Sequence, residues 1–142
     1  MSITSANSVL ALGVNNLFPT AQQMIGFATD DAYEIDAVDV TEALLGVDGI
    51  MSTGWVPQIK TMHVTLQPDS PSMQFFEQWY AAQEAAEEIY TAFGTVYQPG
   101  VSLSYNLVNG VLANYTPLAG AKKILAPRHF QIKWQSVLGG PA

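Results

Sequence analysis

The side chains that could carry out chemistry in this chain are few, and they do not form a familiar catalytic pattern. The two histidines, His63 and His129, lie in separate alternating segments, and there is no cysteine to complete a zinc site. Glu34 and Asp36 could in principle serve as the acid and the base of a glycosidase. Residues two apart on a strand point the same way, however, so these carboxylates would lie side by side and not on opposite sides of a substrate.

Other motifs of catalysis and cofactor binding are missing from the sequence. The acidic run from Asp30 to Asp36 lacks the spacing and the glycine of an EF-hand calcium loop. No nucleophile elbow, Walker loop, dinucleotide-binding fingerprint or zinc-protease motif occurs. We therefore expect a protein that is not an enzyme and that binds no metal or cofactor, with both histidines as structural or surface residues.

The composition indicates a protein with large contact surfaces. Hydrophobic residues make up 49% of the 142 residues and charged residues only 12%, against roughly a quarter in ordinary soluble proteins. The length suits one domain, residues 1 to 142. No apolar run is long enough to cross a bilayer and no basic residue precedes the first apolar stretch, so we expect a soluble chain that is neither exported nor in contact with a membrane.

The net charge of −7 is distributed unevenly along the chain. All the acids up to Asp48 precede the first basic residue, Lys60, and the remaining bases come after residue 120. This layout argues against binding a nucleic-acid backbone, which requires clustered bases. Either both clusters are solvated surfaces, or an acidic edge of one copy meets a basic edge of the next.

Two segments alternate between apolar and polar residues and predict strands with one polar face each. In the segment 33 to 41, Glu34 and Asp36 share a face that is wet or lines a space favouring negative charge. In the segment 60 to 67, the apolar row is expected to face a core. That row is Met62, Val64 and Leu66, and the polar row is Thr61, His63, Thr65 and Gln67.

An amphipathic helix is predicted over about residues 71 to 93. Ser70 followed by Pro71 is typical of a helix start. Apolar residues then recur at three- and four-residue steps, with glutamates between them, which is typical of a helix that covers a core. The residues expected to point into the core are Phe75, Phe76, Trp79, Ile89 and Phe93.

Residues 42 to 58 form a long connection that is unusually apolar. Its three glycines and one proline are typical of a loop, but a loop so rich in apolar residues is more often functional or interfacial than idle. It is either a long hairpin that projects from the body and packs on a neighbouring molecule, or a short helix folded over the core. The apolar residues concerned are Leu44, Leu45, Val47, Ile50, Met51, Trp55 and Val56.

The remaining segments complete a mainly β fold. Residues 1 to 21 are expected to form an N-terminal arm with a short strand at 9 to 14, ordered by a partner. Asn109-Gly110 predicts a hairpin, and residues 136 to 142 a frayed C-terminus. With six to eight strands and one clear helix, we expect a β-sandwich or barrel with the helix on one flank.

In this order of elements the chain resembles bacteriophage tail tube proteins, whose fold is shared with the tube protein of type VI secretion. The resemblance rests on VTLQPDSPS at 64 to 72 leading into the helix, on the apolar hairpin with Val47-Asp48-Gly49, and on the closing strand Pro127 to Trp134. It covers roughly residues 22 to 135.

The resemblance implies a structural virion protein of the phage tail, assembled in the host cytoplasm. Its subunits would form hexameric rings whose strands join into one barrel, and the rings would stack into a tube that delivers DNA. Residues 42 to 58 would reach an adjacent ring. The channel would be lined by Glu34, Asp36, Thr61, His63, Thr65 and Gln67, whose acids would repel DNA so that it passes without specific binding.

The partners implied by the resemblance are further copies of the chain and the tape measure, baseplate and terminator proteins, with a sheath if the tail is contractile. One alternative is a tail-completion or baseplate ring protein that does not polymerise. An alternative of a different class is a small-ligand-binding barrel. In that case a cavity would be surrounded by Met62, Val64, Leu66, Leu103 and Tyr105.

Overall fold

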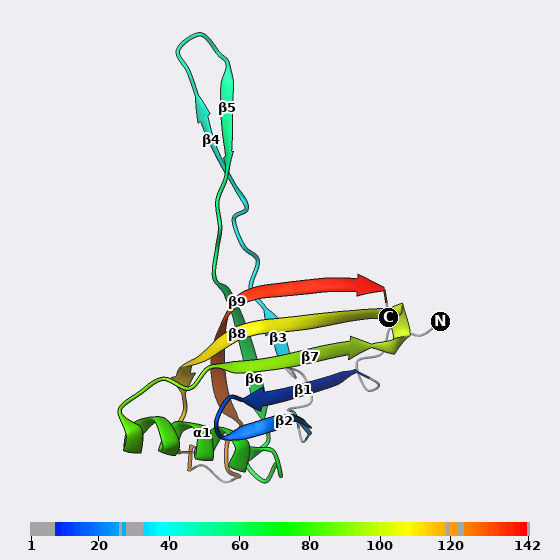
Figure 1. Ribbon diagram of the computed structural model, residues 1–142, viewed down its shortest axis with the longest axis vertical. Helices are drawn as coiled ribbons and strands as arrows, with labels where there is room; N and C mark the ends of the chain where they lie inside the picture. The colour runs from blue at the N-terminus through cyan, green and yellow to red at the C-terminus, as the bar shows by residue number, and fades with distance from the viewer. Residues whose placement is uncertain (1–7, 26, 28–32, 119, 122–123, 142) are drawn as a thin grey trace.

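The computed structural model describes residues 8–25, 27, 33–118, 120–121 and 124–141. They form a seven-stranded antiparallel sheet in the order β2-β1-β7-β8-β9-β6-β3, a separate two-stranded sheet β4-β5 and one α-helix (Figure 1). The elements are β1 Val9–Val14, β2 Phe18–Gln23, β3 Tyr33–Ile35, β4 Thr41–Leu45, β5 Met51–Trp55, β6 Lys60–Leu66, α1 Met73–Ala86, β7 Ala92–Gln98, β8 Leu103–Tyr115 and β9 Arg128–Pro141, with a 3-10 turn at Pro99–Val101. The mainly β class with one helix is therefore confirmed.

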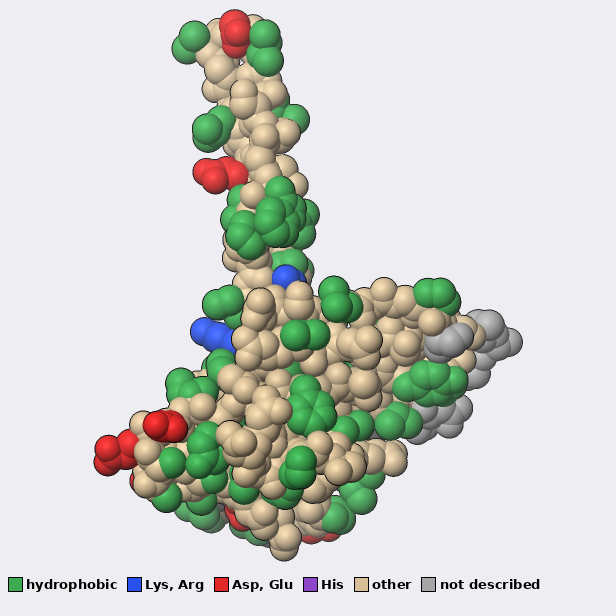
Figure 2. All heavy atoms as spheres, in the orientation of Figure 1, with side chains coloured by type: hydrophobic (Ala, Val, Ile, Leu, Met, Phe, Trp, Pro, Cys, Tyr) green, Lys and Arg blue, Asp and Glu red, His purple; other side chains and the backbone are tan. Residues whose placement is uncertain are grey.

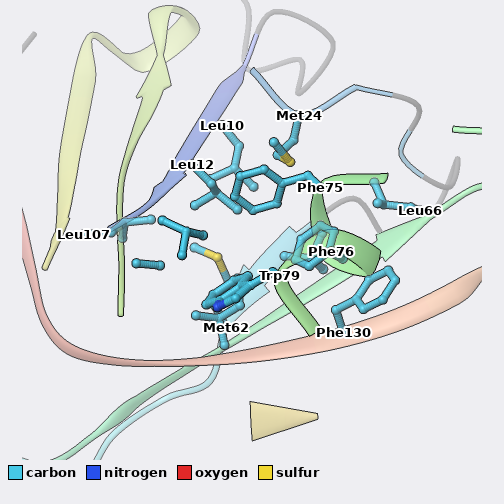
Figure 3. Packing of buried hydrophobic residues seen from close by; sticks show 14 of the residues in the cluster. Leu10, Leu12, Met24, Met62, Leu66, Phe75, Phe76, Trp79, Leu107 and Phe130 are labelled. Carbon is cyan, nitrogen blue, oxygen red and sulfur yellow. The ribbon is translucent and has the colours of Figure 1, made fainter. Parts of the chain in front are cut away.

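The core lies between the inner face of the large sheet and α1, which sits at the opposite end of the body from the β4-β5 hairpin (Figure 1). Met62, Val64 and Leu66 of β6 are fully buried, as their alternation predicts. Figure 3 shows the aromatic side chains of α1 reaching in among leucines of β1 and Phe130 of β9. Phe76 stacks on Phe130 with ring centroids 4.3 Å apart, so the helix and the closing strand share one packed layer.

The helix is shorter than the sequence pattern predicts. Phe75, Phe76 and Trp79 are buried as expected, but α1 ends at Ala86, and Glu87 after it has a left-handed φ of 55°. Ile89 is consequently 70% exposed and Phe93 belongs to β7, so neither is a helix core residue. Two further bonds fix the end of the helix: the Trp79 indole donates to the Tyr90 carbonyl, and the Tyr90 amide donates to the Gln83 side chain.

The predicted N-terminal arm is an integral part of the sheet over its described residues. The strand at 9 to 14 is confirmed as β1, which lies between β2 and β7. Leu10, Leu12 and Val14 are fully buried against the core, so these residues are ordered by their own chain and not by a partner. Residues 1 to 7 lie outside the described part.

The Asn109-Gly110 hairpin and the frayed C-terminus are both corrected by the structure. β8 runs without a turn from Leu103 to Tyr115, and Asn109 takes a φ of 52° where the pairing with β7 changes register. An Asn-Gly pair favours positive φ in a bulge as well as in a turn, which explains the wrong prediction. β9 continues to Pro141, paired with Leu103.

Gly110→Ala is expected to cost about 1–3 kcal/mol of unfolding free energy. Gly110 lies opposite Trp134, whose fully buried ring covers it, and an added Cβ would come within 2.4 Å of that ring. Gly54→Ala is the matched control, because no heavy atom lies within 4 Å of its added Cβ. Urea unfolding of both variants measures the difference, and equal stabilities would contradict the close contact.

Candidate assembly surfaces

The β4-β5 hairpin projects from the body as an extended ribbon (Figure 1). Every residue of its two strands is exposed. Its tip is closed by bonds between Gly46 and Ile50, by the Asp48 side chain accepting the Ile50 amide at 3.1 Å, and by Gly49 at a φ of 81°. Of the two interpretations of the segment 42 to 58, the projecting hairpin is therefore correct.

The hairpin is continuous with the edge of the large sheet. The Val56 amide donates to the Val40 carbonyl just below β4-β5, and further down the Asp36 amide donates to the Thr61 carbonyl beside β3-β6. The two legs are thus bonded to each other just below β4-β5 and again beside β3-β6, while the strands belong to separate sheets.

The hairpin carries apolar side chains with no core to bury them. Trp55 is 79% exposed and Leu45 76%, and both lie on one face, while Leu44 lies on the other. Figure 2 shows apolar side chains at the tip and along the ribbon. All the expected contact residues lie on this ribbon, with Val56 alone partly buried at its base. Such a surface is typical of a site that packs against another protein, because an isolated two-stranded hairpin is only marginally stable in water.

The outer face of β3 and β6 brings together five of the six residues predicted to line a channel. Register places Glu34 opposite His63, and the His63 Nε2 lies 2.9 Å from an Asp36 carboxylate oxygen. Thr61 shares this face by alternation. Thr65 also lies on it but is buried, with its hydroxyl 3.1 Å from His129 Nδ1. Gln67 lies just past the end of β6.

β9 adds side chains to this face that the sequence did not assign to it. His129, Gln131 and Lys133 lie opposite Thr65, His63 and Thr61. The alternation of β9 is visible in the sequence, but the pairing of two strands more than sixty residues apart is not. Lys133 makes the face less acidic than expected.

A buried arginine ties the helix to the sheet. The Arg128 guanidinium, 7% exposed, lies 2.7 Å from a Glu77 carboxylate oxygen of α1 and donates to the Tyr115 hydroxyl and the Thr116 carbonyl. This cluster could not be predicted, since nothing in the sequence pairs residue 77 with residue 128. Its partners satisfy the guanidinium inside the protein, so we assign it a structural role.

The large sheet is open, and its two edges are β2 and β3. β2 is exposed along most of its length and β3 over two of its three residues. Edge strands present unpaired N–H and C=O groups that a strand of another chain can complete.

Within the described residues, no three of His, Asp and Glu gather into a metal-binding group. No helix there is long and apolar enough to span a bilayer.

The sequence matches the family model of the tail fiber protein gp32 over residues 1–138. The chain belongs to this gp32 family. No curated protein matches it. The gp32 family is one of structural tail proteins, so the chain is a tail component and not an enzyme.

The fold of the gp32-family chain is similar to chains of contractile injection systems. A chain of the extended sheath/tube terminator of an extracellular contractile injection system, PVC, matches with a TM-score of 0.65 and 10% identity, covering 99% of this chain and 97% of that one. A chain of the anti-feeding prophage baseplate matches with a TM-score of 0.64 and 9% identity, again covering 99% of this chain and 97% of that one. A chain of the PVC sheath-tube complex in the extended state matches with a TM-score of 0.57 and 12% identity, covering 94% of this chain and 88% of that one. The fold is therefore tail-tube-like.

The interior of the gp32-family chain is largely filled by the helix. Val64 and Leu66, two of the residues expected around a ligand cavity, are fully buried in the packed core. Met62 and Tyr105, two others of that set, line an open cleft of about 280 Å³ beside β3. The packing therefore favours a structural role over a ligand-binding barrel.

Proposed function

We propose that this protein forms hexameric rings that stack into a tail tube, the channel for DNA delivery. The observation that carries the proposal is the apolar hairpin, which extends from a tail-tube-like body and has no packing partner within the described chain. A subunit that worked alone would leave this surface in water, whereas a neighbouring ring would cover it.

Ring formation is supported by the two open edges of the sheet. In a closed ring with rotational symmetry, each subunit contacts the next through two different surfaces. The β2 edge of one copy and the β3 edge of the next are such a pair, and their backbone groups would complete each other. Repeated around the ring, this contact would give one continuous barrel.

The outer face of β3 and β6 is then the proposed channel wall. Glu34 and Asp36 on it would repel DNA phosphates, while the polar side chains beside them allow the genome to slide. Further copies of the chain are the first partners. Tape measure, baseplate and terminator proteins are the others, with a sheath in a contractile tail, in line with the sheath-tube and baseplate assemblies that hold similar chains.

Electron microscopy of the concentrated protein tests the proposal directly. We expect six-fold rings, and tubes made by stacking them, at concentrations where dilute samples are monomeric. A protein that stays monomeric across a wide concentration range would overturn it.

A second candidate is a terminator or cap ring at the end of a tube. It is supported by the fold similarity to the terminator chain and to a chain of the anti-feeding prophage cap, which matches with a TM-score of 0.60 and 13% identity, covering 100% of this chain and 93% of that one. Both match this chain with TM-scores at least as high as that of the chain from the sheath-tube complex. A terminator would form single rings that do not stack, which the same micrographs distinguish.

Changing Glu34 and Asp36 together to Lys is expected to preserve tubes but to lower infectivity by about tenfold or more, because lysines facing the channel would bind DNA phosphates. Plaque titres of phage that carry the variant measure the effect. The control changes Glu84 and Glu88, both exposed near the end of α1 and beyond it, to Lys. Unchanged infectivity of the Glu34 and Asp36 variant would place these residues on the outer wall.

A further inference from the structure

Both histidines of the chain lie on the outer face of β3, β6 and β9, the face proposed to line the channel. His63 comes from β6 and His129 from β9. The register places them at neighbouring steps of this strand pair, because His63 lies opposite Gln131 and His129 lies opposite Thr65. His129 is exposed and the side chain of His63 is 33% exposed, so water reaches both imidazoles.

Two acids lie beside His63 on its β3 side. Glu34 is the residue directly opposite it, and an Asp36 carboxylate oxygen lies 2.9 Å from its Nε2. The Asp36 amide donates to the Thr61 carbonyl, and this backbone bond holds the carboxylate next to the imidazole. A proton on His63 therefore forms an ion pair and offsets the charge of an acid that is otherwise turned to solvent.

On the β9 side the face carries one fixed cation. Lys133 lies opposite Thr61, two residues along β9 from Gln131. Lys60 has the opposite parity in β6 and belongs to the other face. Beyond β9, the positions of β8 opposite Lys133 and Gln131 are uncharged. Within the described residues, the charged groups that face the two histidines are therefore Glu34, Asp36 and Lys133.

The sign of the charge on this face depends on the two histidines. With both imidazoles neutral, two carboxylates and one ammonium give the described part of the face a net charge of −1 per subunit. With both imidazoles protonated, the net charge is +1. Histidine is the side chain that ordinarily changes charge between pH 5 and 8, where carboxylates and lysines largely keep theirs. The change of two charges per subunit amounts to twelve in a hexameric ring.

We propose that His63 and His129 make the channel wall an electrostatic switch, which repels DNA at about pH 8 and retains it at about pH 5.5. The inference rests on the proposed function, in which this face lines the channel, and it adds the regulation of that wall. The group that the acid form binds is the phosphate of the DNA backbone. Binding is therefore expected to be independent of base sequence.

Sedimentation of tubes with bound DNA tests the switch. Tubes are assembled at about pH 5.5 with a short fluorescent double-stranded DNA, and one half of the sample is then moved to about pH 8. Electron micrographs show whether the tubes are intact in both halves. We expect the tubes at the lower pH to carry about tenfold more DNA into the pellet, because phosphate binding depends steeply on the number of cations on the wall.

Two variants assign the effect to the proposed groups. His63→Gln combined with His129→Gln leaves the chain without a histidine, and it is expected to retain little DNA at either pH. Changing Glu34 and Asp36 to Lys is the opposite control, expected to retain DNA at both. Each single histidine variant should lie between the original chain and the double variant. Melting temperatures show that each variant is folded.

The outcomes separate this inference from the proposed function. If tubes form but carry the same amount of DNA at both pH values, the switch is wrong and the tube proposal stands. An equal pH effect in the chain without histidines also overturns the switch, because other groups then carry it. If the protein forms neither rings nor tubes, the proposed function fails, and the switch fails with it because this face lines no channel.

Discussion

Replacing Trp79 by Ala is expected to lower the free energy of unfolding by about 3–5 kcal/mol. The Trp79 side chain is fully buried at the centre of the core, beside Phe75 and Phe76. Its removal leaves a cavity that the surrounding sheet and helix fill only in part. It also removes the indole N–H that donates to the Tyr90 carbonyl at 3.0 Å, which helps to fix the chain after α1.

Urea unfolding of dilute protein measures this loss without a contribution from assembly. Tyr80→Ala is the matched control, since Tyr80 is the next residue of the same helix but 40% exposed, and its substitution should cost far less. If the two variants unfold at the same urea concentration, Trp79 is not the central core residue that the structure makes it.

Trp55→Ala is expected to leave the melting temperature nearly unchanged while preventing rings from stacking. Trp55 lies on the hairpin, 79% exposed and remote from the core, so its removal costs little folding energy. Buried tryptophans at interfaces are frequent hot spots worth about 2 kcal/mol or more, which is roughly a thirtyfold change in the concentration required for assembly.

Sedimentation velocity and electron microscopy across a concentration series measure the stacking defect. Thr53→Ala, on the same face of the hairpin, controls for general damage to the ribbon and should stack nearly normally. Normal tubes from the Trp55 variant would show that the hairpin does not join rings through this side chain.

The elements that could be predicted are those in which apolar residues keep one spacing, that of a strand or that of a helix, long enough to exclude the other. The strict alternation from Thr61 to Leu66 predicts β6 and its buried row correctly. The close spacing of Phe75, Phe76 and Trp79 predicts the inner face of α1. The excess of apolar residues around Trp55 is compatible with a projecting hairpin and with a helix over the core, and the two exposed strands of the structure decide for the hairpin.

The remaining parts depend on contacts that a local pattern does not contain. The apolar steps run on past Ala86 because Ile89 and Phe93 continue a helix-like spacing by chance, although Phe93 belongs to β7. The role of Asn109-Gly110 is decided by the ring of Trp134, which lies in another strand. The placement of Lys133 on the polar face required the pairing of β6 with β9.

The two legs of the hairpin lead directly into β3 and β6, and a backbone hydrogen bond joins the legs at each end, from Val56 to Val40 and from Asp36 to Thr61. A hairpin held by a second molecule would restrain β3, the edge strand through which the proposed ring would be joined. Capture of the tip would then lower the conformational entropy lost when the ring closes. Stacking and ring closure would reinforce each other, so that growth on an existing ring is favoured over new rings in solution.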